Sequence, residues 1–119
     1  MKYSKVLVID DSSTFLKLIK DVLSKEGVNV LLADNISQGL DIIKTEKPKL
    51  ILLDLIFKEE HGFGLLRTLK KDKILDSTNV IVLSAQNENT VIAKAMKLGA
   101  SDYLTKPINI QALKNKCGF

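Results

Sequence analysis

Short runs of apolar residues alternate along this chain with longer segments in which apolar residues recur every three or four positions. The short runs predict β-strands, and the longer segments predict helices with one apolar face. Strands are predicted at residues 5–9, 29–33, 49–53, 79–83 and, from a weaker pattern, 102–105. The runs 5–9, 49–53 and 79–83 are nearly continuous in Val, Ile and Leu, which is typical of parallel strands covered by helices on both faces.

Five helices are predicted between and after these strands. Gly27 and Gly99 are predicted to stop the first and the fourth helix, Asn35 to cap the second, and Pro48 to break the chain after it. The fifth helix is predicted to begin near Pro107. The apolar faces of the five helices consist of Phe15, Leu16, Ile19, Val22 and Leu23, then Ile36, Leu40 and Ile43, then Phe63, Leu66 and Leu69, then Val91, Ala95 and Leu98, and finally Ile110 and Leu113.

The strict alternation of strands and helices predicts an α/β fold with a parallel sheet. Right-handed crossovers between five strands favour the doubly wound, flavodoxin-like order 2-1-3-4-5, flanked by five helices. In this order the first and third strands are neighbours, and their connections leave toward opposite faces of the sheet. A crevice is therefore expected at their carboxyl ends, where such folds bind ligands.

The composition fits one domain over residues 1–119, since 45% of the residues are hydrophobic and 27% are charged. The formal net charge is +4, but Arg67 is the only arginine among 18 basic residues, and the lysines are scattered. Direct nucleic-acid binding is therefore not expected. The single Cys117 and the lack of a secretory signal predict a cytoplasmic location. No apolar run approaches the roughly 20 residues that span a bilayer, so no membrane association is expected.

Three carboxylates are predicted to meet at the crevice expected at the carboxyl ends of the first and third strands. Asp10 and Asp11 follow the first strand, and Asp54 follows the third. Like charges at one site are costly unless a cation shares it, and oxygen ligands of this kind favour Mg²⁺. Taken alone, Asp10 and Asp11 fit equally well as caps of the first helix. Asp54 closes a hydrophobic strand, where a structural role is hard to find and a nucleophilic carboxylate is well placed.

Two further strand ends contribute polar groups to the same edge. Ser84 ends the fourth strand and supplies a hydroxyl that can donate to an anion. Lys106 follows the fifth strand and supplies a compact positive charge. Each residue alone is an ordinary surface choice. Together with the carboxylates, they predict a site that binds a metal ion and an anionic group.

The sequence resembles the receiver domain of bacterial two-component response regulators, of the chemotaxis-regulator-like kind, over essentially its whole length. The resemblance rests on Val-Ile-Asp-Asp at 8–11, Leu-Leu-Asp at 52–54, Val-Leu-Ser-Ala at 82–85 and Gly-Ala-Ser-Asp-Tyr-Leu-Thr-Lys-Pro at 99–107. It implies a phosphoryl group on one aspartate, transferred from a sensor histidine kinase or a phosphotransfer protein, and a downstream output domain or protein partner. It further implies these residue roles: Asp54 as phosphoacceptor; Asp10, Asp11, Asp54 and the backbone carbonyl of Ile56 as Mg²⁺ ligands; Ser84 and Lys106 on the phosphoryl oxygens; and Ser84 with Tyr103 as the switch.

The chain departs from the family pattern after Asp54. Lys58 stands where the family usually has proline, which predicts a more mobile loop there. His61, the single histidine, is assigned no chemistry. Ile56 is apolar and can screen a phosphoryl group from water, which predicts slow dephosphorylation. Tyr103 also fits as an ordinary aromatic at the sheet edge.

Other functions remain open at this stage. A pseudo-receiver would keep the fold as an interaction module without phosphorylation, although all five implied site residues are present. A phosphatase of the haloacid dehalogenase type has a similar first strand, but it requires a second aspartate where Ser12 stands. A flavodoxin-like electron carrier is disfavoured because the loop after the first strand lacks glycine and aromatic residues make up only 5% of the chain. In the leading interpretation the chain catalyses its own modification and is not a conventional enzyme.

Overall fold

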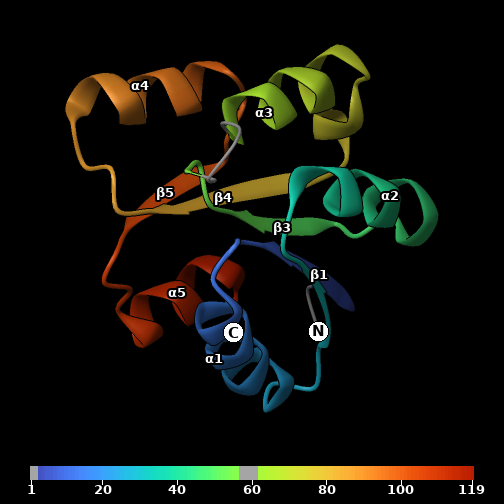
Figure 1. Cartoon of the computed structure of the whole chain (residues 1–119). Helices are drawn as coiled ribbons and strands as arrows, with labels where there is room; N and C mark the ends of the chain where they lie inside the picture. The colour runs from blue at the N-terminus through green and yellow to red at the C-terminus, as the bar shows by residue number, and fades with distance from the viewer. Residues whose placement is uncertain (1–2, 57–61) are drawn as a thin grey trace.

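A parallel β-sheet forms the middle layer of the protein in the computed structural model, which describes residues 3–56 and 62–119 (Figure 1). Its five strands have the predicted order β2-β1-β3-β4-β5. The third strand begins one residue later than predicted, and the fourth extends one residue further, through Ser84. The strands are β1 (Lys5–Ile9), β2 (Asn29–Ala33), β3 (Leu50–Leu53), β4 (Asn79–Ser84) and β5 (Asp102–Thr105).

Helices cover both faces of the sheet (Figure 1). Helices α1 and α5 lie on one face, and α2, α3 and α4 lie on the other. The expected doubly wound α/β architecture is therefore confirmed. The helices are α1 (Ser13–Ser24), α2 (Ile36–Glu46), α3 (Gly62–Lys71), α4 (Asn89–Lys97) and α5 (Ile110–Cys117), with a short 3₁₀ helix, η1 (Ile74–Asp76), after α3.

The central strands are apolar at successive positions because both of their faces are buried. In β1, Val6 and Val8 pack on the side of α1 and α5, whereas Leu7 and Ile9 pack on the side of α2, α3 and α4. All four residues are at most 1% exposed. Burial of such a side chain contributes about 1.5–3 kcal/mol, so these central strands supply much of the driving force for folding.

The fifth helix begins later than predicted. It starts at Ile110, because the side chain of Asn109 accepts a hydrogen bond from the backbone N–H of Ala112 and caps the helix there. Pro107 therefore lies before the helix, which contradicts the prediction from sequence. At its far end, Cys117 is buried against the α1 side of the sheet, and burial raises the pKa of its thiol to about 11.

The glycine and asparagine signals around the other helices are largely borne out. Asn35 caps α2 through the N–H of Gln38, and Gly99 follows α4 with a positive φ of 106°. Gly27 has a φ of 81° but lies in the turn beyond α1, which ends at Ser24 with Lys25 as its cap. The predicted stop at Gly27 is thus displaced by two residues from the observed cap.

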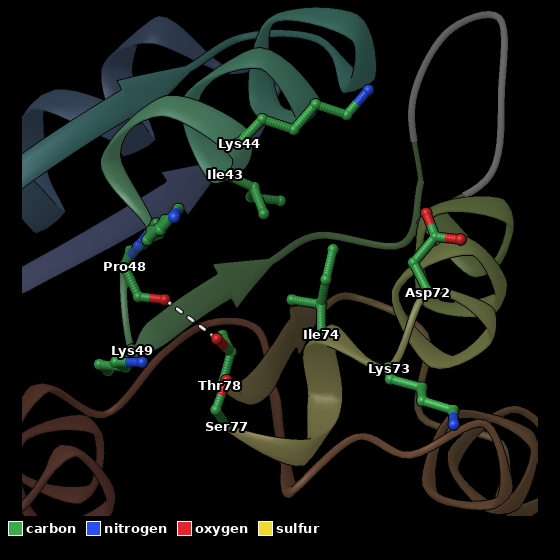
Figure 2. A pocket seen from close by; sticks show the side chains of 10 residues that line it. Ile43, Lys44, Pro48, Lys49, Asp72, Lys73, Ile74, Ser77 and Thr78 are labelled. Carbon is green, nitrogen blue, oxygen red and sulfur yellow. Dashed lines mark hydrogen bonds between the residues drawn. The ribbon is translucent and has the colours of Figure 1, made fainter.

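A pocket of about 410 Å³ lies at the opposite edge of the sheet from the predicted site. It is formed by the end of α2, the start of β3 and the segment around η1 (Figure 2). Inside it, the Thr78 hydroxyl donates a hydrogen bond of 3.1 Å to the Pro48 carbonyl. Its lining includes Lys44, Lys49 and Lys73 but none of the predicted site residues. Among the described residues, no helix has the length and hydropathy needed to cross a membrane.

Candidate functional site

Backbone pairing brings the carboxylates of Asp10 and Asp54 to one edge of the sheet. Ile9 pairs with Leu53 at the carboxyl ends of β1 and β3, and the N–H of Asp54 donates to the carbonyl of Ile9. Asp10 is 1% exposed and Asp54 is 8% exposed, whereas Asp11 is exposed. One carboxylate oxygen from each of the three lies within 4.8 Å of the other two. The predicted convergence of the three acids is therefore observed.

Helix α1 is capped by Ser12 rather than by either aspartate. The Ser12 hydroxyl oxygen accepts a hydrogen bond of 3.2 Å from the N–H of Phe15. Asp10 instead accepts a hydrogen bond of 2.9 Å on Oδ1 from the N–H of Ser12. This bond fixes the Asp10 carboxylate and leaves its Oδ2 directed toward the other strand ends. The alternative interpretation of Asp10 and Asp11 as caps of this helix is therefore not supported.

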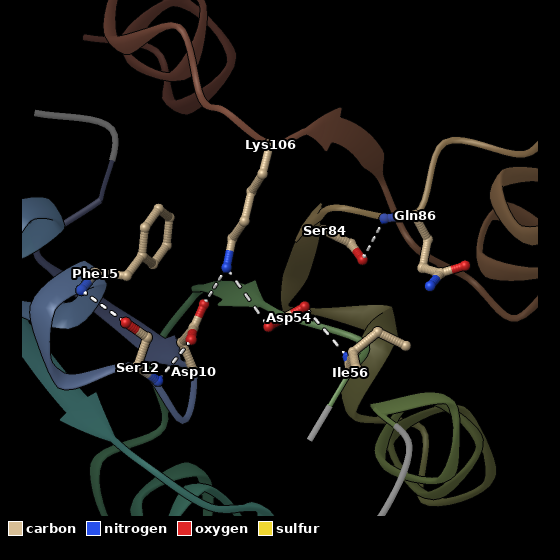
Figure 3. A network of polar contacts seen from close by, with 8 residues as sticks. All are labelled: Asp10, Ser12, Phe15, Asp54, Ile56, Ser84, Gln86 and Lys106. Carbon is tan, nitrogen blue, oxygen red and sulfur yellow. Dashed lines mark hydrogen bonds and ion pairs between the residues drawn. The ribbon is translucent and has the colours of Figure 1, made fainter. Parts of the chain in front are cut away.

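The ammonium group of Lys106 lies between the two buried carboxylates (Figure 3). Its Nζ is 2.7 Å from Asp10 Oδ2 and 3.5 Å from Asp54 Oδ2. The backbone N–H of Lys106 donates to the carbonyl of Ser84, which anchors the base of the side chain next to the end of β4. Because buried charges are costly without partners, Lys106 offsets part of the cost of burying two neighbouring carboxylates.

The environment of Asp54 favours its neutral form more than water does. Burial raises the pKa of the Asp54 carboxyl, and the negative charge of Asp10 raises it further. A hydrogen bond of 3.2 Å from the Ile56 N–H to Oδ1 and the ammonium of Lys106 lower it, but they do not outweigh burial. Oδ1 of Asp54 thus faces the backbone of Ile56, while Oδ2 faces Lys106.

Gly62 allows helix α3 to begin close against the backbone of Asp54. A Cβ atom at position 62 would lie 2.6 Å from the Asp54 carbonyl oxygen, and the Gly62 N–H donates a hydrogen bond of 2.8 Å to the Leu55 carbonyl. The glycine is therefore needed for close approach. Lys58 and His61 lie outside the described residues, so the predicted loop mobility stays a prediction.

Ser84 and Tyr103 are connected through the backbone of Gln86. The fully buried Ser84 hydroxyl oxygen accepts a hydrogen bond of 3.2 Å from the Gln86 N–H. The Tyr103 hydroxyl donates a hydrogen bond of 2.6 Å to the Gln86 carbonyl. Burial raises the pKa of the Tyr103 phenol, which is protonated at neutral pH even at its ordinary pKa and can donate this hydrogen bond. No pattern in the sequence singles out Gln86 as the residue between them.

Ile56 lies at the edge of the site, and the residue is 37% exposed (Figure 3). Its N–H contacts Asp54, as described above. Another apolar residue was missed by the sequence analysis as part of the site: the ring of Phe15 lies 4.1 Å from the Lys106 Nζ. Phe15 belongs to the apolar pattern of α1, and nothing in that pattern distinguishes a residue that contacts a lysine from one that packs in the core.

The donor set at this edge fits a hard divalent cation. All three candidate side chains offer carboxylate oxygen, two of them are buried, and the third is exposed on the solvent side. A Mg²⁺ ion binds oxygen at about 2.1 Å, so two ligands on opposite sides of it are about 4.2 Å apart. One oxygen of each carboxylate lies within 4.8 Å of the other two, so the three acids are near enough to share one ion after small side-chain movements.

Comparisons with known proteins agree with this geometry. The family model of the response regulator receiver domain matches residues 6–117 of this chain. The chain is 33% identical to Protein PilH of Pseudomonas aeruginosa over 110 residues, which cover 92% of this chain and 91% of PilH. It is 35% identical over 111 residues to the transcriptional regulatory protein KdpE of Staphylococcus aureus. That match covers 93% of this chain but 47% of KdpE, so the chain spans about half the length of this relative.

A solved structure supports the same assignment. The receiver domain of the Francisella response regulator 1452 superimposes with a TM-score of 0.90 at 32% identity, covering 97% of this chain and 93% of that one. The strand order and the acidic edge of the sheet are those expected of this class. These matches support the receiver interpretation over the phosphatase and the electron-carrier alternatives. The chain belongs to the family of response regulator receiver domains, the phosphoacceptor domains of two-component systems.

Proposed function

We propose that Asp54 is the residue of this receiver domain that accepts the phosphoryl group, and that the domain spans residues 1–119. The observation that carries the proposal is the position of Lys106, whose ammonium lies 3.5 Å from Asp54 Oδ2 while it donates to Asp10. A buried nucleophile with a fixed positive charge beside it is the arrangement that transfer of an anionic group requires.

In the proposed reaction, a carboxylate oxygen of Asp54 attacks the phosphorus of a phosphohistidine on a kinase or phosphotransfer protein. A new O–P bond forms, the P–N bond breaks, and the leaving imidazole nitrogen retains the electron pair. The transition state is loose and in line, so the domain contributes mainly positioning and charge neutralisation. Lys106 offsets the charge of the transferred group, and the Ile56 N–H orients Asp54 through its hydrogen bond of 3.2 Å to Oδ1.

We further propose that Asp10, Asp11 and Asp54, with the backbone carbonyl of Ile56, hold Mg²⁺. When bound, this ion would neutralise charge on the phosphoryl oxygens and orient them. The oxygen-only chemistry of the three carboxylates and their separation within 4.8 Å support this assignment. The chain's own part is to keep two of these carboxylates buried and oriented through the N–H groups of Ser12 and Ile56.

The proposed switch runs through the segment after β4. A phosphoryl group on Asp54 adds acceptor oxygens to which the Ser84 hydroxyl can donate. Movement of Ser84 would disturb the hydrogen bond that it accepts from Gln86, and the Gln86 carbonyl is the partner of the Tyr103 hydroxyl. The state of Asp54 would thus reach Tyr103 and the surface formed by α4, β5 and α5, where a partner that prefers one state shifts the population.

The proposed binding partners are those that the receiver family implies. We propose a sensor histidine kinase or phosphotransfer protein as the phosphodonor and an output domain or separate protein as the target. Direct nucleic-acid binding is not proposed for this domain, because Arg67 is its sole arginine and its lysines are dispersed. Catalysis is confined to the domain's own modification, so it is not a conventional enzyme. The cytoplasmic location stays a prediction.

Intact mass spectrometry tests the proposal. The full chain is incubated with Mg²⁺ and phosphoramidate, a donor that contains the P–N bond but needs no partner protein. The wild type is expected to gain the mass of one phosphoryl group, and Asp54→Asn is expected to gain none. Asp72→Asn serves as the matched control and is expected to behave like the wild type. It alters an exposed acid that does not belong to the cluster of Asp10, Asp11 and Asp54. A pseudo-receiver would leave all three chains unmodified.

A further inference from the structure

Four residues around the site form a closed chain of contacts (Figure 3). Asp10 accepts from the Ser12 N–H, and the Ser12 hydroxyl accepts from the Phe15 N–H. The Phe15 ring lies 4.1 Å from the Lys106 ammonium, which returns to Asp10 through its hydrogen bond of 2.7 Å. The first turn of α1 thereby fixes both the carboxylate that Lys106 binds and the ring that it contacts.

We propose that Phe15 is a positioning residue for Lys106, with its ring holding the ammonium beside Asp54 through a cation–π contact. This inference rests on the proposed role of Asp54. A lysine side chain has a flexible stem and loses much rotamer freedom when its end is fixed. Its ammonium has three N–H bonds. One is directed to Asp10, Asp54 lies 3.5 Å away, and the aromatic face occupies a third side.

The ring contact differs from the carboxylate contacts in one functional respect. Asp10 and Asp54, which would help to hold Mg²⁺, are also the two carboxylates that Lys106 contacts. The face of Phe15 attracts the cation through its quadrupole and is not a metal ligand. Phe15 would therefore still hold Lys106 at the site when these carboxylates also bind the metal. The Lys106 side chain is 22% exposed, so water screens its charge only in part.

Substitutions that weaken, remove or strengthen the aromatic face at position 15 test the proposal. We expect site-specific 3,4,5-trifluorophenylalanine at position 15 and Phe15→Leu to slow modification by phosphoramidate at saturating Mg²⁺ by about fivefold. That loss corresponds to about 1 kcal/mol, at about 1.4 kcal/mol per tenfold. Phe15→Trp provides a stronger cation–π face and is expected to retain the wild-type rate.

A second readout separates positioning from general packing. In the wild type, the Lys106 methylene protons next to Nζ lie by an aromatic face, so the ring current is expected to shift their NMR signals upfield. This shift should be lost in Phe15→Leu and should persist when Mg²⁺ is added to the wild type. Lys94→Met is the matched control. The Lys94 Nζ lies 4.4 Å from the centre of the Phe63 ring, in a cation–π contact that does not involve Lys106. This variant is expected to leave the phosphorylation rate unchanged.

The outcomes are distinct. An unchanged rate in the trifluorophenylalanine protein, or Lys106 signals that do not depend on Phe15, would overturn the inference. Loss of rate in proportion to a loss of thermal stability, with no rescue by Trp, would likewise assign Phe15 a packing role only. If the wild type gained no phosphoryl group at all, the proposed function would fail, while the NMR comparison would still decide whether Phe15 holds Lys106.

Discussion

Lys106 donates a hydrogen bond of 2.7 Å from its ammonium to the buried carboxylate of Asp10, although the two residues lie near opposite ends of the chain. The contact is possible because parallel strands place the residues that follow β1 and β5 at the same edge of the sheet. It supplies a positive charge at an edge where three acids meet. The proposed chemistry of the domain depends on this arrangement.

Removing that positive charge should impair both folding and phosphorylation. Lys106→Met leaves Asp10 buried without its ionic partner, which we expect to destabilise the metal-free domain by roughly 1–3 kcal/mol. Urea denaturation in the presence of a chelator measures this loss. The phosphorylation rate with phosphoramidate should fall at least about tenfold. Lys116→Met, which breaks an exposed pair with Asp102, is the control and should change neither quantity appreciably.

Replacement of Asp11 should weaken Mg²⁺ binding but hardly change the free energy of unfolding. Asp11 is exposed, so Asp11→Asn is expected to leave the free energy of unfolding within about 0.5 kcal/mol of the wild type. Isothermal titration calorimetry should show Mg²⁺ affinity reduced by roughly tenfold or more, because one of the three carboxylates is lost. Asp21→Asn changes an exposed acid on α1 and should bind Mg²⁺ as the wild type does. Equal affinity in both variants would contradict the assignment of Asp11.

Gly62 and Gly64 provide a matched pair for testing how closely α3 approaches the site. Gly62→Ala would place a Cβ atom 2.6 Å from the Asp54 carbonyl oxygen, so we expect destabilisation of about 1–3 kcal/mol and slower phosphorylation. Gly64 lies in the same helix, and a Cβ atom at position 64 would meet no described atom within 4 Å. Gly64→Ala should therefore stabilise the domain by about 0.5–1 kcal/mol. Chemical denaturation of the two variants, side by side, measures both effects.

The raised pKa of Asp54 makes a prediction about stability and pH in the absence of metal. A carboxyl whose pKa is higher in the folded than in the unfolded state opposes folding once it ionises. Asp54→Asn should therefore be more stable than the wild type at pH 7 in a chelator. The difference should shrink as the pH falls toward 3.8, the ordinary pKa of the group. Denaturation curves across this range would contradict the account if the variant were the less stable protein at pH 7.

Ile56 should lengthen the life of the phosphoryl group. Its apolar side chain lies at the edge of the site, and we expect it to limit access of water to a phosphoryl group on Asp54. Ile56→Asn is expected to hydrolyse the phosphoryl group several-fold faster, as followed by intact mass after removal of the donor. Met96→Asn replaces another exposed apolar residue and should leave the lifetime unchanged. Identical lifetimes in all three proteins would remove Ile56 from this role.

Much of the fold follows from simple patterns in the sequence. Val6, Leu7, Val8 and Ile9 are all buried, so an unbroken apolar run correctly predicted a strand covered on both faces. The carboxylates of Asp10 and Asp54 could be placed together because parallel strands share a carboxyl edge. The predicted start of α5, near Pro107, lay about one turn too early. The side chain of Asn109 caps the helix and fixes its first turn.

Other parts of the site depend on tertiary contacts that no local pattern reports. Phe15 has the spacing of a core residue on α1, and its contact with Lys106 exists only once β5 lies beside β4. Gln86 joins Ser84 and Tyr103 through its backbone N–H and carbonyl, groups that every non-proline residue carries. Its side chain therefore gives no indication of this role.

Chemical labelling of the phosphorylated side chain identifies which aspartate carries the phosphoryl group. The domain is phosphorylated with phosphoramidate and Mg²⁺, the acyl phosphate is reduced with borohydride, and the peptides are sequenced by tandem mass spectrometry. The account predicts homoserine at position 54, with Asp10 and Asp11 unchanged. Homoserine at another aspartate, or an unmodified Asp54 in a protein that has gained a phosphoryl group, would contradict it.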